Sequence, residues 1–175
     1  MGNIDTLPKF KYHPNLYKSD MVHFNRGKCE CCGKDVTAFI SDMYCVKNIS
    51  CICLECVADG SASEKFDGSF IQDAESEVSD SEKTDELFNR TPGYISWQGE
   101  YWLTCCDDYC AFIGDVGIKE LEEMEIADEV VQEYCDKVSI KPDEIREYLE
   151  PAGSCAGYLF QCLHCGKYHL WSDCD

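Results

Sequence analysis

The sequence has no apolar run that approaches the length of about 20 residues needed to cross a bilayer. Basic residues are also scarce: 15 lysines and arginines stand against 34 aspartates and glutamates, which gives a net charge of −19. A surface this negative repels phosphate, so we expect no direct nucleic-acid partner, and we expect no membrane partner. A partner attracted by charge should itself be basic, although a negative surface also serves solubility.

The motifs of common enzyme classes are missing as well. The chain has no glycine-rich phosphate loop and no H-E-x-x-H or H-x-E pattern, its four histidines are scattered, and Ser61 has no histidine near it. The acidic residues look solvated rather than placed for acid–base chemistry. We therefore predict that the protein is not an enzyme.

Residues 1–10 contain no apolar stretch like that of a secretory signal, so we expect a cytoplasmic protein. That expectation changes the meaning of the 15 cysteines. The cytosol keeps thiols reduced, so cysteine at this density indicates metal ligands rather than a disulfide framework.

The first cysteine motif is Cys29-x-x-Cys32, followed by Gly33. Two cysteines at this spacing can form a tight turn, or knuckle, that points both sulfurs at one ion, and glycine reaches positive φ without cost. Cys53-x-x-Cys56 follows at a spacing usual for zinc modules. A knuckle, a hairpin and two ligands in the first turn of a helix form a treble clef, so we predict a zinc site made by Cys29, Cys32, Cys53 and Cys56.

A second knuckle, Cys162-x-x-Cys165 with Gly166, lies near the end of the sequence. Cys106 and Cys110 have a ligand-like spacing and would complete it, with a helix-like pair first and the knuckle last. The predicted second site is Cys106, Cys110, Cys162 and Cys165, and the protein should hold two structural zinc ions. Three residues remain open as replacements for a ligand: Cys31, Cys105 and His164.

The other cysteines are expected to pack as small buried residues: Cys31, Cys45, Cys51, Cys105, Cys135, Cys155 and Cys174. A thiol oxidoreductase is the alternative, because C-x-x-C is also a redox motif. Such a site needs one motif after a strand in a βαβ unit, whereas this chain has paired motifs with knuckle glycines. Catalytic zinc is disfavoured because an all-thiolate shell leaves no position open for water.

These patterns predict an α+β fold with two treble-clef or zinc-ribbon-like modules joined by short helices, in one compact domain spanning 1–175. An N-terminal zinc module should occupy 1–71 and an acidic, mobile loop 72–88, with a C-terminal zinc module at 89–175. The C-terminal module should contain a helical insertion at 118–150.

Local patterns refine this outline. We expect an extended edge segment at 7–17, a hairpin of 36–40 with 43–46, helical turns within 57–66 and strands within 91–103. The insertion should contain a helix over 118–134 that is broken near Ala127, and a second helix from Pro142 to Leu149. A final hairpin should fold over the second knuckle.

Several strings resemble the bacterial CbrC family, and they span nearly the whole chain. They are Leu7–Pro14, Cys53–Ala62, Lys65–Gly68, Thr91–Tyr94, Trp97–Gln98, Trp102–Leu103, Cys106–Gly114 and Tyr158–Gly166. In the family pattern a histidine precedes the cysteine matched by Cys106, whereas Cys105 stands there in this chain. The resemblance implies a link to tolerance of nuclease colicins, relatives proposed as immunity proteins, and no enzyme activity.

Nuclease toxins carry basic surfaces, so the resemblance and the net charge agree. We expect a non-enzymatic zinc-binding immunity or tolerance protein that binds and neutralises a basic nuclease-type toxin domain. The alternative is a zinc-ribbon regulatory or stress-response protein that contacts nucleic acid or the transcription machinery. The predicted contact residues are Asp73, Glu75, Glu77 and Asp80 in the acidic loop and Glu122, Glu123 and Glu125 on the helix.

Overall fold

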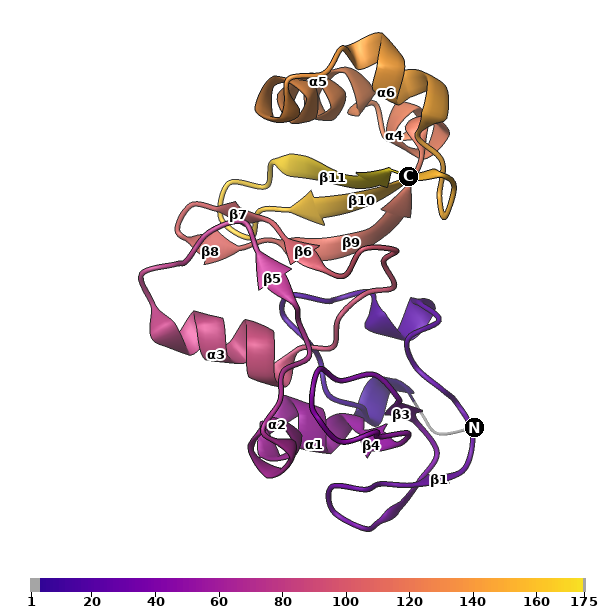
Figure 1. Cartoon of the computed structure of the whole chain (residues 1–175), viewed down its shortest axis with the longest axis vertical. Helices are drawn as coiled ribbons and strands as arrows, with labels where there is room; N and C mark the ends of the chain where they lie inside the picture. Colours follow the sequence, from indigo (N-terminus) through magenta and orange to yellow (C-terminus); the bar gives the residue numbers. More distant parts are fainter. Residues whose placement is uncertain (1–3, 175) are drawn as a thin grey trace.

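The computed structural model describes residues 4–174, and Figure 1 shows the arrangement of its helices and strands. The short 3-10 turns η1 and η2 cover Ile4–Thr6 and Leu16–Lys18. The α-helices of the described chain are α1 (Leu54–Ala58), α2 (Ser61–Phe66), α3 (Ser81–Arg90), α4 (Ile118–Glu123), α5 (Ala127–Val138) and α6 (Pro142–Tyr148). None of the helices within 4–174 is long and apolar enough to span a membrane.

The strands are short except in one sheet, in which β10 lies between β9 and β11 in antiparallel order. They are β1 (Gly27–Lys28), β2 (Asp35–Val36), β3 (Phe39–Ile40), β4 (Ile52–Cys53), β5 (Asp73–Ala74), β6 (Tyr101–Trp102), β7 (Thr104–Cys105), β8 (Asp108–Tyr109), β9 (Ala111–Val116), β10 (Cys155–Gln161) and β11 (Tyr168–Cys174). The pairs β1–β2, β3–β4 and β7–β8 are antiparallel, and β5–β6 is parallel. The fold is therefore mixed α+β, as predicted.

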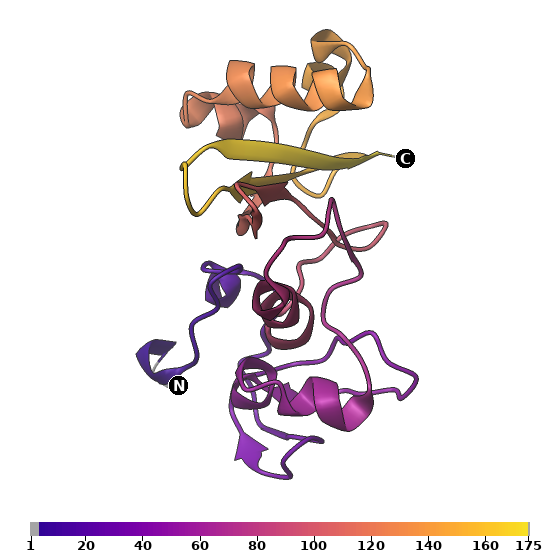
Figure 2. The same ribbon diagram turned by 90° about the vertical axis from the view of Figure 1, so that its left-hand side faces the viewer.

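The β9–β10–β11 sheet separates two layers (Figures 1 and 2). Successive side chains of a strand point to opposite faces, so β10 serves both layers. Leu159 packs with the helices α4–α6, while Tyr158 and Phe160 join an aromatic core on the other face. Tyr94 and Phe112 stack in that core with ring centroids 4.4 Å apart. The nearly continuous burial of β10 follows from having a core on each side.

The molecule has two halves: the N-terminal half, whose core lies within residues 10–70, and the second half, which contains the β9–β10–β11 sheet and its two cores. The N-terminal segment crosses between them. Phe10 and Leu16 pack in the core of the N-terminal half, whereas Tyr12 is buried in the aromatic core. Its carbonyl accepts a hydrogen bond from the N–H of Phe112 at 2.8 Å. The predicted edge segment is thus an irregular connector, and the core of the second half includes a residue from the predicted N-terminal module.

The prediction of an acidic, mobile loop at 72–88 is wrong for residues 81–88, which belong to the helix α3. The Asp80 carboxylate caps this helix by accepting from the N–H of Glu82 at 3.0 Å. Leu87 is fully buried, and Arg90 pairs with Asp85 at 2.8 Å. Capping, one buried apolar contact and ion pairs therefore stabilise a helix that the acidic composition did not predict.

The predicted hairpin of 36–40 with 43–46 is also wrong. Phe39–Ile40 pairs instead with Ile52–Cys53, across a longer loop, because both isoleucines are fully buried there. Tyr44 forms an isolated bridge with Ser69. In the helical insertion, by contrast, α4 and α5 are separated close to the predicted break, and α6 begins at Pro142 as predicted.

Candidate metal centres

The first cysteine group is the one that the sequence predicts. The sulfur atoms of Cys29, Cys32, Cys53 and Cys56 all lie within 4.8 Å of one another. The knuckle lies between β1 and β2, where Cys29 N–H donates to the Lys34 carbonyl at 2.9 Å and Gly33 N–H donates to the Cys29 carbonyl at 2.8 Å. Gly33 has a φ of 75°, which glycine adopts without strain.

The second pair of this group is held by the start of a helix. Cys53 ends β4 and is the N-cap of α1, and Cys56 lies in the first turn of α1. Leu54 and Val57 of the same helix are fully buried, so core packing fixes the rotation of the helix and hence the position of Cys56. The order of knuckle, strand pair and helix matches the prediction.

One thiol of the first group is predisposed to ionise. Burial alone would raise the pKa of Cys29, but the N–H groups of Cys53, Cys32 and Cys31 outweigh it and lower the pKa to about 7. The Cys53 N–H lies 3.3 Å from the Cys29 sulfur. Burial raises the pKa of Cys56 to about 12. Four thiolates at these distances therefore need a cation between them.

The second knuckle repeats the hydrogen bonds of the first. Cys162 N–H donates to the Lys167 carbonyl at 2.8 Å, and Gly166 N–H donates to the Cys162 carbonyl at 3.1 Å. Gly166 has a φ of 73°. Burial would raise the pKa of the Cys162 thiol, but the N–H groups of Cys165 and His164 help to lower it to about 6. The two knuckles thus use the same local chemistry.

The partner pair of the second knuckle differs from the prediction. The sulfurs of Cys105, Cys106, Cys162 and Cys165 lie within 4.8 Å of one another, so Cys105 takes the place assigned to Cys110. Cys106 and Asp107 both have positive φ, at 53° and 54°, in the tight turn between β7 and β8. Two such residues form the turn type that suits antiparallel hairpins. The second group therefore joins two hairpins, and no helix contributes to it.

Cys110 lies beyond this turn, on the return path of the chain. It is fully buried in the aromatic core, and its carbonyl accepts a hydrogen bond from the Trp102 indole at 2.8 Å.

The other two residues that the sequence left open as replacement ligands make contacts outside the cysteine groups. The Cys31 sulfur lies 3.7 Å from the Ser61 hydroxyl, and His164 donates to Asp108 at 2.8 Å. The sequence feature that could have revealed the β7–β8 turn is Cys105-Cys106-Asp107-Asp108, because aspartate tolerates positive φ.

The sulfur–sulfur distances test the fit to a metal. A zinc–sulfur bond of about 2.3 Å in a tetrahedron separates neighbouring sulfurs by about 3.8 Å. The distance from Cys32 to Cys53 is 3.8 Å in the first group. In the second, Cys105 lies 3.7 Å from Cys106 and 3.8 Å from Cys165. Both groups can hold a metal ion, and their sulfur chemistry is consistent with zinc.

A buried carboxylate supports the second group. Asp108 is 2% exposed and accepts from the Tyr12 hydroxyl at 2.7 Å and from His164. It also pairs with Lys11 at 3.3 Å and Lys83 at 3.5 Å. Burial raises the pKa of Asp108, but the His164 and Tyr12 hydrogen bonds and the Lys11 charge lower it to about 2. Sequence reasoning missed this residue because its partners are distant along the chain.

Two cysteines outside both groups depart from the prediction of simple packing. Cys155 and Cys174 face each other across β10 and β11, and a disulfide joins them. Strand register brings these residues together, and spacing in the sequence does not reveal register. Cys51 and Cys135 are buried free thiols, in agreement with the prediction for them.

Comparison with known proteins adds the family. A UPF0167 protein of Pseudomonas aeruginosa is 36% identical over 171 residues, which cover 93% of this chain and 94% of the relative. UPF0167 proteins of Mycobacterium bovis and Mycobacterium tuberculosis are 32% identical over 175 residues, covering 95% of this chain and 93% of each relative. No solved structure matches the chain. The model of the uncharacterised protein family UPF0167 matches residues 7–174, and the chain belongs to that family.

Proposed function

We propose that this protein is a non-enzymatic, zinc-stabilised immunity or tolerance protein that binds a basic nuclease-type toxin domain and blocks its substrate site. The net charge of −19 is the observation that carries the proposal, because it favours a cationic partner over nucleic acid. The resemblance to the CbrC family supplies the class of partner. Cytoplasmic localisation is part of the same proposal.

Zinc would act structurally in this scheme. Both groups consist of four thiols, and a complete sulfur shell leaves no open position for substrate or water. When bound, zinc would supply the positive charge that allows the four sulfurs of each group to be thiolates together. The ion would stabilise the fold in the same way in a treble clef and in a zinc ribbon, which are the module types that we propose for the first and second groups.

The arrangement of acids supports a contact at the corner between α4 and α5. Glu122, Glu123 and Glu125 are exposed there, and within residues 4–174 only Glu122 approaches a base, with Arg146 4.0 Å away. In the segment before α3, by contrast, Glu75 accepts from Thr104 N–H at 3.0 Å and pairs with Lys137 at 3.3 Å. Asp80 caps α3. Glu75 and Asp80 of the predicted acidic loop are therefore engaged within the fold, whereas Glu123 and Glu125 at the helical corner form no ion pair within residues 4–174.

The zinc part of the proposal is tested by elemental analysis of the purified, reduced protein. We expect close to two zinc ions per chain, and removal of zinc by a chelator should unfold the N-terminal module around the first cysteine group. A reduced protein that is metal-free and folded would overturn this part.

The binding part is tested with purified cationic nuclease domains of colicin-type toxins, of both DNase and RNase class. We expect salt-sensitive binding that inhibits the nuclease, and weaker binding by the triple variant Glu122→Gln, Glu123→Gln, Glu125→Gln. The matched control removes three exposed acids from the N-terminal half: Glu55→Gln, Glu64→Gln, Asp67→Asn. Equal loss in both variants would indicate net charge alone and argue against this contact face.

Absence of binding and of protection across the panel would count against the immunity function. A salt-sensitive shift of DNA or RNA by the protein alone would favour the regulatory alternative. Disulfide reduction with turnover that survives removal of metal would favour the oxidoreductase.

A further inference from the structure

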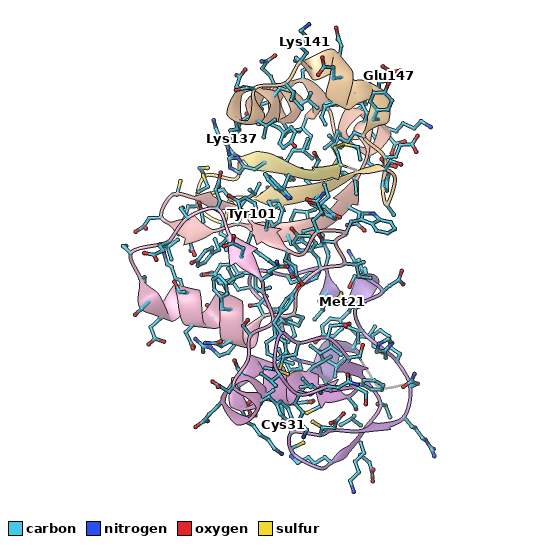
Figure 3. The ribbon with its side chains drawn as sticks, viewed as in Figure 1. Met21, Cys31, Tyr101, Lys137, Lys141 and Glu147 are labelled. Atoms are coloured by element: carbon cyan, nitrogen blue, oxygen red, sulfur yellow. A yellow bond between two sulfur atoms is a disulfide. The ribbon has the colours of Figure 1, made fainter. Side chains whose placement is uncertain are left out.

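A cavity of about 360 Å³ lies where loops of the two halves meet. The N-terminal half contributes Met21, Met43 and Phe70 to its lining, and the loop before β6 contributes Tyr94 and Ile95. Figure 3 shows Met21 between the β9–β11 sheet and Cys31. Six of the nine residues that line it are apolar or aromatic, as in many ligand pockets of this size.

One buried carboxylate interrupts this apolar wall. Glu100 lines the cavity and is only 8% exposed. Its carboxylate accepts a hydrogen bond from the Tyr44 hydroxyl at 2.5 Å, which joins the two halves at the cavity. A Cβ atom on Gly93 would lie 2.1 Å from a Glu100 carboxylate oxygen, so glycine at this position makes room for the carboxylate.

The cavity contains negative charge without a matching cation. No lysine, arginine or histidine lines it, and Glu100 forms no ion pair with any basic residue in the range 4–174. Asp42, which also lines the cavity, adds a second negative charge. Burial raises the pKa of Glu100, and the Tyr44 hydrogen bond opposes that effect. A bound cation would offset the cost of keeping this carboxylate charged in an apolar setting.

We propose that this cavity binds an ammonium or guanidinium group carried on a short apolar stem, with Glu100 as its counter-ion. The stem would lie against Met21, Met43 and Phe70. The cation belongs either to a free organic amine or to a lysine or arginine side chain of a basic partner. In the second case the inference rests on the proposed function.

Methionine methyl groups give a direct test, because Met21 and Met43 line the cavity whereas Met124 follows α4 and is 39% exposed. The zinc-loaded protein, labelled with ¹³C at its methionine methyls, is titrated with n-butylammonium. Neutral n-butanol and anionic butyrate serve as probes with the same stem. We expect saturable shifts of Met21 and Met43 with n-butylammonium, smaller shifts with n-butanol, and an unmoved Met124.

Glu100→Gln should weaken n-butylammonium binding at least 10-fold while zinc content and the Met124 signal stay unchanged. Glu77→Gln is the matched control, because it removes one exposed acid outside the cavity and should leave binding unaltered. Equal shifts with n-butanol, or unchanged affinity in a folded Glu100→Gln protein, would overturn the inference.

A second arm repeats the titration with the cationic nuclease domains. Movement of Met21 and Met43 with both n-butylammonium and a domain supports insertion of a partner side chain. Movement with n-butylammonium alone supports a site for a free amine, even if the proposed toxin binding fails. Binding of a domain without any response to n-butylammonium would overturn the cavity inference and leave the proposed function standing.

Discussion

Each of the two cysteine groups contains a knuckle of the same form, but the second pair of cysteines comes from a different kind of element in each group. In the first, the start of α1 supplies Cys53 and Cys56, and the surrounding core is made of short elements. In the second, the β7–β8 turn supplies Cys105 and Cys106, beside an aromatic core and the β9–β11 sheet. The first half therefore has less structure that is independent of the metal. Loss of metal should be more damaging in the first half than in the second.

The largest expected effect is that of Cys29→Ser. Removing one thiolate should eliminate one zinc ion and unfold the N-terminal half, because structural zinc supplies on the order of 10 kcal/mol of binding energy. Metal analysis and amide hydrogen exchange would measure both changes. Cys31→Ser is the neighbouring control, since Cys31 lies outside the group, and it should retain two ions. If amide protection in the N-terminal half persists in Cys29→Ser, that half does not depend on its metal more strongly than the second half does.

Cys105→Ser should also remove one zinc ion, but the sheet and its two cores should remain protected from exchange. Cys110→Ala should keep both ions and cost about 1 kcal/mol of stability through lost burial. Metal content and thermal unfolding distinguish the two variants. A single ion in Cys110→Ala, with two in Cys105→Ser, would restore the ligand set that the sequence predicts.

Asp108→Asn should destabilise the second half by about 2–3 kcal/mol, because it removes the charge that pairs with Lys11, Lys83 and His164. The pKa of Asp108 is lowered in the fold, so its stabilisation is present above about pH 4 and declines as the pH falls towards about 2. Urea unfolding measures the loss. Asp107→Asn changes an exposed neighbour and should cost clearly less than Asp108→Asn. Equal costs would show that the buried pairing is unimportant.

The smallest effect concerns the connector between the halves. Burial lowers the pKa of His13 from 6.5 to about 4, so the unfolded chain binds the proton more readily and stability falls as the pH drops through this range. Between pH 7 and pH 5 the free energy of unfolding should therefore decrease by about 1–2 kcal/mol less in His13→Gln than in the unchanged protein. Zinc ligation is common to both proteins, so the difference between their unfolding curves isolates His13. Parallel curves would contradict a buried neutral histidine.

Local chemistry allowed much of this protein to be predicted. Gly33 and Gly166 identify the knuckles because positive φ is a property of a single turn, and Pro142 marks the start of α6 for an equally local reason. Composition was misleading at α3, where one buried leucine and a cap outweigh the acidic residues. Cys110 was predicted as a ligand in place of Cys105 because the tight turn at Cys106 and Asp107 was not recognised.

The net charge, the two knuckles and the first cysteine group follow from the sequence alone. The charge is a sum over residues, and the motifs depend on residues that are close together in the chain. The folded chain was needed to show that Cys105 replaces Cys110, that Cys155 faces Cys174, and that Tyr12 and His164 both bind Asp108. It also placed Tyr44 beside Glu100, 56 residues along the chain, in a cavity between the halves. The physical reason is that turn geometry, strand register and core packing bring distant residues together, and spacing alone does not specify them.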